Sequence, residues 1–599
     1  MKPTSEILKR IRENSSKHSQ EIFTRLYRYL LREDTYFIAY QNLYANRGAG
    51  TKGTNNDTAD GFSLDYIHKI ITELKELKYE PRPVRRTYIE KRNGKMRPLG
   101  IPSFKDKLIQ EVIRSILEAI YEPLFSSHSH GFRPQRSCHT ALKEISYSFR
   151  GIKWFIEGDI KGCFDSIEHN ILLNILSSKI RDSKFLNLIR KFLKAGYMEN
   201  WVYHKTYSGT PQGGILSPIL ANIYLNELDK KVKLMSNDFE VFLGNRRTHV
   251  YNKQRYRIMT LKKQYSMLTD PLARKEMLQQ IHKAKVELRK LPSKNATDKK
   301  LAYVRYADDF IIGISGTRKE AEKIKEELKL FLAQELGLEL SEEKTQITHS
   351  SENANFLGYN INVRRTNKVK KTINGIRQRT IKNKVELLIP MRKIEEFLYG
   401  HHIVEQAQDG KMTPVHKSAL TVYSDLEIVD TYNAQTRGIC NYYRMASNFA
   451  KLNYFIYLME YSCLKTLASK HRTSISKIIK KYRIGHRWGI PYETTKGKKS
   501  LFIAKYPDFH RREYSEDIDT ILIRVHTNTR STIEARLKAR KCELCGVEGE
   551  NYKYEIHHVN KMKNLKGKTK WEQAMIARKR KTLVLCHECH QKIHNPSKV

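Results

Sequence analysis

The chain has 599 residues, of which 40% are hydrophobic, so it is too apolar to be disordered and too long for a single core. Lys and Arg number 110 against 64 Asp and Glu, a net charge of +46 that favours a polyanionic partner such as nucleic acid. A membrane protein is excluded, because no stretch approaches the ~18 apolar residues of a transmembrane helix. The N-terminus carries no recognisable secretory signal, so we expect a cytoplasmic protein of about two to four domains.

The first 80 residues alternate helical patterns with a polar connection, rich in Gly, Asn and Thr, at 48–60. Residues 83–102 predict a basic hairpin, with Asn93-Gly94 as the turn between two strands. An amphipathic helix is predicted next, from apolar residues that recur at helical spacing: Leu108, Val112, Ile113, Ile116, Leu117 and Ile120.

A lysine-rich segment at about 230–300 contains little Gly and no aromatic-dense core. It predicts an exposed helical insertion whose charges face solvent or RNA. Residues 360–414 are basic and turn-rich, and residues 426–483 return to helical patterns.

Two β-rich runs flank the pair Asp308-Asp309, which predicts a tight turn between strands. The two carboxylates are adjacent there and repel each other. A separate β-rich run ends in Asp159. If the strands are neighbours, the three carboxylates converge and can hold the two Mg²⁺ ions of an in-line phosphoryl transfer. The alternative is that the Asp-Asp pair only marks a solvent-exposed hairpin turn.

The neighbouring motifs favour the catalytic interpretation, because over residues 1–365 the chain resembles the reverse transcriptase domain of group II intron-encoded proteins. Seven motifs carry the resemblance in the family's order: Met96-Arg-Pro-Leu-Gly-Ile-Pro, Gly131-Phe-Arg-Pro-Gln-Arg-Ser, the strand ending in Asp159, Ser208-Gly-Thr-Pro-Gln-Gly-Gly, Tyr306-Ala-Asp-Asp, Leu340-Ser-Glu-Glu-Lys-Thr and Phe356-Leu-Gly-Tyr. The resemblance implies the fingers and palm of a right-hand polymerase.

The same resemblance implies roles for individual residues. Phe164 would exclude a ribose 2′-hydroxyl, and Gln212 would line the nucleotide pocket. Lys91 and Arg97 would hold the triphosphate, whose charge requires cations. Lys344 would protonate the pyrophosphate leaving group, and the alternative is a lysine on a solvated loop.

Residues 366–500 resemble the family's α-helical thumb, or maturase domain X. The match lies in Leu426-Glu-Ile-Val, Arg437-Gly-Ile-Cys-Asn-Tyr-Tyr and Tyr461-Ser-Cys-Leu-Lys. A helical layer rich in Tyr, Lys and Arg suits structured RNA, although tyrosines also pack helices together. Residues 501–540 resemble the family's DNA-binding segment in position and charge.

Two Cys-x-x-Cys pairs lie near the C-terminus and predict a closed Zn²⁺ site in a reducing compartment. The pairs are Cys542 with Cys545 and Cys586 with Cys589. The gap between them exceeds that of a zinc ribbon and holds His557-His558 on a predicted strand. His590 and His594 follow the second pair at a spacing that shares one helix face.

Residues 541–599 resemble an HNH endonuclease, a small ββα-metal fold. The resemblance implies that His557, His590 and His594 bind a catalytic ion, expected to be Mg²⁺, and that His558 deprotonates the attacking water. One position departs from the family pattern, since Lys581 stands where an Asn is usual. The alternative is a structural zinc knuckle that binds DNA without cutting it.

The predicted fold is therefore a multi-domain α+β protein that combines fingers and palm, thumb, DNA-binding segment and HNH domain. The resemblance implies a maturase, a reverse transcriptase and a second-strand nuclease that act together in retrohoming. Its expected partners are the intron RNA, double-stranded target DNA and deoxynucleoside triphosphates, in a bacterial cytoplasm near the nucleoid. Two alternatives stay open: a reverse transcriptase without an intron partner, and a maturase-only RNA chaperone.

Overall fold

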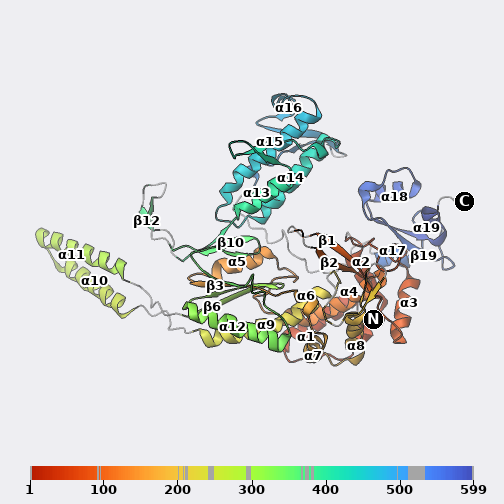
Figure 1. Ribbon diagram of the computed structural model, residues 1–599, viewed down its shortest axis with the longest axis horizontal. Coiled ribbons are helices and arrows are strands. Elements are labelled where there is room, and N and C mark those ends of the chain that lie inside the picture. Colours follow the sequence, from red (N-terminus) through yellow and green to blue (C-terminus); the bar gives the residue numbers. More distant parts are fainter. Residues whose placement is uncertain are drawn as a thin grey trace.

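The computed structural model describes residues 3–46, 48–90, 94, 96–199, 202–206, 208–209, 213–240, 248–291, 299–365, 369–371, 375, 377–379, 383–494, 497–509 and 533–595. Figure 1 shows a central body of sheets and helices, a mainly helical layer beside it, a projecting helical hairpin and a small C-terminal domain.

The N-terminal region contains mostly helices and one long hairpin. Its elements are α1 Thr4–Lys17, η1 Tyr27–Leu31, α2 Glu33–Leu43, α3 Leu64–Lys75, β1 Val84–Glu90, β2 Met96–Ile101, α4 Phe104–Tyr121, η2 Glu122–Leu124 and α5 Cys138–Ser148. The predicted hairpin and the helix after it are confirmed by β1, β2 and α4. Ser103 caps α4, because its hydroxyl accepts a hydrogen bond from the backbone N–H of Asp106.

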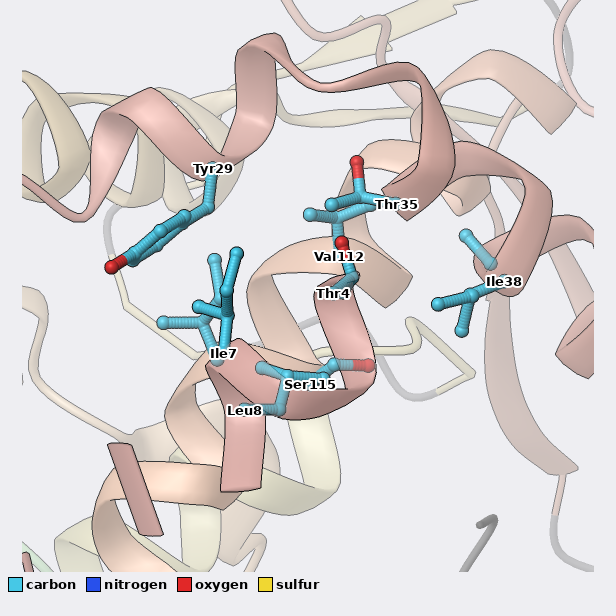
Figure 2. Close-up of a pocket in the computed structure, with 10 residues that line it drawn as sticks. Thr4, Ile7, Leu8, Tyr29, Thr35, Ile38, Val112 and Ser115 are labelled. Atoms are coloured by element: carbon cyan, nitrogen blue, oxygen red, sulfur yellow. The ribbon is translucent and has the colours of Figure 1, made fainter. Parts of the chain in front are cut away.

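The N-terminal helices bury their apolar faces against one another around α4. They leave a gap of about 20 Å³ between α1, η1, α2 and α4. Figure 2 shows that mainly apolar side chains such as Ile7, Leu8 and Val112 surround it, with the hydroxyls of Thr4 and Ser115 at its edge. A gap of this size holds about one water molecule, so it is a packing defect and not a functional site.

The middle of the chain builds the central sheet and the helices that cover it. Its elements are β3 Trp154–Asp159, α6 Cys163–Ser166, α7 His169–Ser177, α8 Ser183–Lys194, β4 Tyr197–Glu199, β5 Val202–His204, α9 Ser217–Phe239, α10 His249–Met267, α11 Pro271–Lys290, β6 Leu301–Tyr306, β7 Asp309–Ile314, α12 Arg318–Leu336, β8 Gln346–His349, β9 Ala354–Phe356 and β10 Tyr359–Val363.

The central sheet is antiparallel, with strand order β6-β7-β3-β8. Alternate side chains enter two different cores, as a sheet covered on both faces requires. Ile156 and Ile312 pack in the core that contains α9 and α12, whereas Phe155 and Ile311 pack in the core that contains α5 and the later helices. A second sheet, of order β2-β1-β4-β5, lies closer to the N-terminus.

The lysine-rich insertion is confirmed as exposed and helical over α10 and α11, which project from the body as a hairpin in Figure 1. Its predicted start at 230 is wrong. Helix α9 continues to Phe239 and buries Val232 and Met235, so these residues belong to the core. Among the described residues, no helix is both long and apolar enough to span a membrane.

The region after β10 was expected to be an α-helical layer, and it also contains strands. Its elements are β11 Val369–Lys371, β12 Arg377–Arg379, β13 Val385–Leu388, α13 Met391–Gly400, β14 Val404–Gln406, β15 Met412–Pro414, η3 Ser418–Leu420, α14 Asp425–Tyr442, η4 Phe449–Lys451, α15 Leu452–Lys470, α16 Ile475–Lys481, β16 Arg483–Ile484, β17 Arg487–Thr494, β18 Gly497–Phe502 and η5 Tyr506–Asp508.

The helical prediction for 426–483 is confirmed by α14, α15 and α16. The turn-rich prediction for 360–414 missed helix α13, which buries Ile394 and Leu398. The α-helical thumb predicted for 366–500 also contains an antiparallel sheet, formed by β16, β17 and β18. Trp488 and Ile490 of β17 are buried at a spacing of two, which is a strand period.

The C-terminal domain contains α17 Ile533–Lys538, β19 Tyr554–His558, η6 Met562–Asn564, α18 Lys570–Arg578, β20 Thr582–Cys586 and α19 His587–His594. Strands β19 and β20 pair in antiparallel register, and α19 follows β20 directly. The predicted strand under His557-His558 and the helix bearing His590 and His594 are confirmed. Most of the expected DNA-binding segment, residues 510–532, lies outside the described residues.

A fully buried ion pair joins the central sheet to α9. The guanidinium of Arg305 in β6 donates to both carboxylate oxygens of Asp229, at 2.8 and 2.7 Å, and neither side chain is more than 1% exposed. It also donates to the carbonyl of Ala307 at 2.8 Å. The backbone of Arg305 pairs with the loop at His128 and His130.

Asp229→Ala should lower the free energy of unfolding by about 3–5 kcal/mol, because it leaves the Arg305 guanidinium charged, buried and unpaired. The matched control is Glu227→Ala on the same helix, whose partner Lys230 is 62% exposed, so losing this ion pair should change stability by less than about 1 kcal/mol. Thermal and urea unfolding of the full chain would measure both. Equal stability of the two variants would contradict the importance of the buried pair.

Candidate active sites

The predicted carboxylates meet at one end of the central sheet. Strand β3 ends at Asp159 and β7 begins at Asp309, and the antiparallel register pairs these two residues directly. Ala307 adopts a left-handed backbone (φ 59°), which makes the turn into Asp308 and Asp309 tight. Gly131 packs on this turn so closely that a Cβ there would lie 2.3 Å from the Ala307 nitrogen.

The carboxylate centre carries more negative charge than its surroundings neutralise. Burial raises the pKa of Asp308, and Asp159 adds to the rise while Arg97 and Lys344 oppose it. Burial, the charge of Asp308 and a hydrogen bond with Asp159 together raise the pKa of Asp309 to about 7. The Lys344 ammonium lies 2.8 Å from Asp159. A divalent cation would relieve this repulsion, so the residues fit a metal.

Of the nucleotide-binding residues that the resemblance implies, Phe164 and Arg97 lie in the part of the chain that the structure describes. Phe164 lies in α6, half-buried, with its ring edge-on to Phe132 at 6.3 Å. The loop bearing Ser208 packs against α6, since the Ser208 hydroxyl donates to the Asp165 carbonyl at 3.1 Å. Arg97 is exposed on β2.

Two of the predicted nucleotide-binding residues, Lys91 and Gln212, lie outside the described residues. Their described neighbours still connect the loop to the hairpin. Gly213 approaches β2 so closely that a Cβ would lie 2.7 Å from a Leu99 methyl carbon. The substrate-pocket motif and the hairpin are therefore adjacent.

The four predicted zinc ligands come together in the C-terminal domain. The sulfur atoms of Cys542, Cys545, Cys586 and Cys589 all lie within 4.8 Å of one another. The Cys545 and Cys586 sulfurs are 3.8 Å apart. Burial raises the pKa of the Cys542 thiol, but backbone N–H groups at Cys545 and Cys586 outweigh it and bring the pKa to about 7. Four thiols so placed fit a tetrahedral Zn²⁺ ion.

The predicted histidines form a second compact cluster, with one member that sequence reasoning missed. Ligand atoms of His557, His590, His594 and Asp60 all lie within 4.8 Å of one another. Within the part of the chain that the structure describes, this cluster and the cysteine cluster are the two sets whose ligand atoms all lie this close together. The carboxylate centre is less compact. Asp60 belongs to the N-terminal region, and no motif marked it in the polar connection 48–60.

His558 sits beside this cluster and is 9% exposed. Its Nε2 lies 2.9 Å from the backbone carbonyl of Tyr44, and its backbone N–H donates to Asp60 at 2.7 Å. Burial lowers the pKa of His558, which keeps the imidazole neutral. Lys581, at the departure from the family pattern, donates to the carbonyl of Ala45 at 3.3 Å.

Comparison with known proteins identifies these regions. Residues 89–251 and 272–361 match the family model "Reverse transcriptase (RNA-dependent DNA polymerase)", residues 382–536 match "Type II intron maturase", and residues 542–590 match "AI2M/AI1M-like, HNH endonuclease".

Among relatives, the group II intron-encoded protein LtrA of Lactococcus lactis is 54% identical over 99% of each chain. This chain belongs to the group II intron-encoded proteins. The 91 kDa protein of the cob intron of Schizosaccharomyces pombe is 37% identical, over 94% of this chain and 69% of that one. A COX1/OXI3 intron 2 protein of Saccharomyces cerevisiae is 32% identical, over 98% and 68%.

The group II intron protein is thus multifunctional, with reverse transcriptase, maturase and HNH endonuclease domains on one chain. The carboxylate centre lies within the reverse transcriptase match, and the cysteine and histidine clusters lie at the endonuclease match. Members of this family bind intron RNA and DNA, which accords with the net charge of +46.

Stabilisation of the group II intron protein by Mg²⁺ should depend on pH. Protonation of Asp309 stabilises the metal-free fold, and this contribution is complete below the ordinary pKa of 3.8 and lost as pH rises through about 7. Because a proton and a cation compete for the carboxylates, the Mg²⁺-induced rise in melting temperature should grow from about pH 6 to about pH 8. Asp309→Asn should flatten this profile. A pH-independent Mg²⁺ effect in the unmodified protein would contradict the competition.

Proposed function

We propose that this protein copies its intron into DNA by target-primed reverse transcription and cuts the second DNA strand during retrohoming. One observation supports the polymerase step above all: Asp159 and Asp309 face each other across neighbouring strands, with Lys344 2.8 Å from Asp159. This arrangement matches the charge distribution that phosphoryl transfer requires.

In this proposal the sheet β6-β7-β3-β8 is the palm of a right-hand polymerase and the sheet β2-β1-β4-β5 belongs to the fingers. The proposed domains are 1–365 for fingers and palm, 366–500 for the thumb and maturase, 501–540 for DNA binding and 541–599 for the endonuclease. Packing supports a close connection of palm and thumb, because Phe155 of β3 and Phe455 of α15 belong to one core.

Polymerisation requires two Mg²⁺ ions, which would activate the primer 3′-hydroxyl and neutralise the triphosphate. Asp159, Asp308 and Asp309 would hold them. Arg97 and Lys91 would bind phosphate oxygens of the incoming deoxynucleotide. Arg97 is near enough to Asp308 to lower the pKa of that carboxyl.

The remaining polymerase roles concern discrimination and the leaving group. Phe164 would meet the sugar and exclude a 2′-hydroxyl, supported by Phe132 against its ring. Gln212 would line the base pocket. Lys344 would donate a proton to pyrophosphate. Its hydrogen bond to Asp159 raises the pKa of Lys344, so the ammonium stays protonated until a substrate competes for it.

In the proposed endonuclease step, the cysteine cluster and the histidine cluster of the C-terminal domain have different roles. Cys542, Cys545, Cys586 and Cys589 would hold a structural Zn²⁺ ion that ties α19 and β20 to the loop before β19. His557, His590 and His594 would hold the catalytic ion, which stabilises the leaving 3′-oxygen when bound. His558 would take the proton from the attacking water, a role that its lowered pKa suits.

The maturase region would hold the intron RNA in a ribonucleoprotein, in the bacterial cytoplasm and near target DNA. Two exposed tyrosines on α15 support base stacking. Tyr454 and Tyr457 are 48% and 46% exposed, and their rings stack with centroids 6.2 Å apart. Most other tyrosines of this layer, such as Tyr432, are buried between helices.

Asp308→Ala should reduce DNA synthesis on an RNA template at least ~100-fold, because it removes a carboxylate from the metal centre. RNA binding and intron splicing should stay near wild-type levels. Asp238→Ala, an exposed aspartate at the end of α9, is the matched control and should polymerise normally. Primer extension with the purified ribonucleoprotein measures synthesis, and unchanged synthesis by the Asp308 variant would rule out the metal assignment.

His558→Ala should slow second-strand cleavage by about 10²–10⁴-fold, the range expected for loss of a general base. Reverse splicing and polymerisation should continue. His486→Ala, an exposed histidine between β16 and β17, serves as control. A labelled duplex containing the target site reports both strands separately. Normal cleavage of the second strand by the His558 variant would assign the base to another residue.

A further inference from the structure

The endonuclease domain is docked on the N-terminal region through backbone pairing. The N–H of Gly61 donates to the carbonyl of Ile556, and the N–H of Ile556 donates to the carbonyl of Phe62, at 2.9 and 3.0 Å. Residues 61–62 thus extend the β19-β20 hairpin at its edge. Phe62 is 1% exposed and stacks on Tyr40 of α2 with ring centroids 4.1 Å apart. Figure 1 shows β19 and α17 lying beside α2.

This pairing carries Asp60 into the histidine cluster. Its Oδ2 lies 2.8 Å from Nε2 of His594 and 3.3 Å from Nε2 of His590, and its Oδ1 lies 3.3 Å from Nδ1 of His557. Nδ1 of His590 lies 2.7 Å from Glu555, which orients the other ring nitrogen toward the cluster. A carboxylate behind an imidazole is a common support for a metal-ligating histidine.

A cluster of carboxylate–histidine ion pairs could also be purely structural, and His557 distinguishes the two cases. It is 4% exposed, and within the described part of the chain its Nε2 has no hydrogen-bond partner. Its Nδ1 lies 3.3 Å from Oδ1 of Asp60 without hydrogen-bond geometry. Leaving a buried imidazole unsatisfied is unfavourable, whereas a bound cation would take the lone pair of its unprotonated ring nitrogen.

The chemistry of the ligand set depends on Asp60. Three imidazoles alone favour Zn²⁺, Cu²⁺, Ni²⁺ or Fe²⁺, whereas Mg²⁺ and Mn²⁺ prefer oxygen ligands and octahedral geometry. A carboxylate adds one hard, negative ligand. Four protein ligands on a six-coordinate ion still leave two positions for water and a phosphate oxygen.

The same N-terminal segment also contacts the general base. The carbonyl of Tyr44 can only accept, so Nε2 of His558 must carry the hydrogen in their 2.9 Å contact. In the neutral ring the lone pair then resides on Nδ1, the atom left to accept a proton from water. The N-terminal region therefore fixes the tautomer of His558 as well as reaching the metal cluster.

We propose that Asp60 is the fourth protein ligand of the endonuclease metal, so that this active site is shared between the N-terminal region and the C-terminal domain. The inference rests on the proposed endonuclease function. The nuclease is then complete only while docked on the reverse transcriptase, which places second-strand cutting and DNA synthesis in one assembled particle.

Mn²⁺ binding to the full chain tests the ligand directly. Asp308→Ala and Asp309→Ala form the background, with Zn²⁺ supplied beforehand, so that the histidine cluster is the site being titrated. Adding Asp60→Asn should weaken Mn²⁺ binding at least ~10-fold, as should His557→Ala, measured by electron paramagnetic resonance of free Mn²⁺. Asp65→Asn is the matched control, because this exposed carboxylate also faces the endonuclease domain, 3.9 Å from the Lys553 ammonium. This substitution should leave the Mn²⁺ affinity unchanged.

Unchanged Mn²⁺ affinity of the Asp60→Asn variant would overturn the proposal. Asp60→Glu keeps the carboxylate and should bind more tightly than Asp60→Asn, and equal weakness of the two would also overturn it. His558→Ala should bind Mn²⁺ normally while losing cleavage. Faster cutting by Asp60→Asn in the otherwise unmodified chain would show that Asp60 inhibits the site. Tight, Asp60-dependent Mn²⁺ binding without any DNA cleavage would support the ligand and reject the endonuclease function.

Discussion

The buried ion pair between Arg305 and Asp229 is the constraint on which the polymerase centre depends. A guanidinium with no exposed surface must satisfy its donors inside the protein, and it does so on helix α9 and on the carbonyl of Ala307. The same residue pairs through its backbone with the loop at His130. Strand, helix, loop and metal-binding turn are thereby held in one geometry. The positions of Asp308 and Asp309 depend on this support, because an unsupported turn could change its conformation.

Two of the side-chain clusters fit a cation, and they balance their charge in different ways. In one, carboxylates lie around Asp309, whose pKa is raised to about 7, and in the other, three imidazoles lie around the carboxylate of Asp60. The carboxylates repel one another without a cation, and binding a cation would remove that penalty, whereas the imidazoles already contact the Asp60 carboxylate. The cysteine cluster differs, since its four thiols would stabilise a small domain through a bound Zn²⁺ ion.

Docking of the C-terminal domain would give the reverse transcriptase region a direct part in the proposed cutting of the second DNA strand. Asp60 and the carbonyl of Tyr44 come from the N-terminal region, yet they contact His594 and His558. A shared site explains why second-strand cutting would be confined to an assembled particle. It also gives Lys581 a local role that the usual Asn would not supply, since its ammonium contacts the carbonyl of Ala45 in the docked segment.

The sequence by itself determined the features that depend on short spacing: the strand that ends in Asp159, the Asp308-Asp309 turn, the cysteine pairs, and His590 with His594 on one helix face. Residue type and local period specify these, so they could be predicted. The strands at β17 and β18, helix α13 and the core part of α9 were missed, because burial against distant segments outweighed local composition there. Only the tertiary structure decided that Arg305 meets Asp229 and that Asp60 meets His594. Those contacts join residues 76 and more positions apart, and no local pattern encodes a partner that folding brings in from another domain.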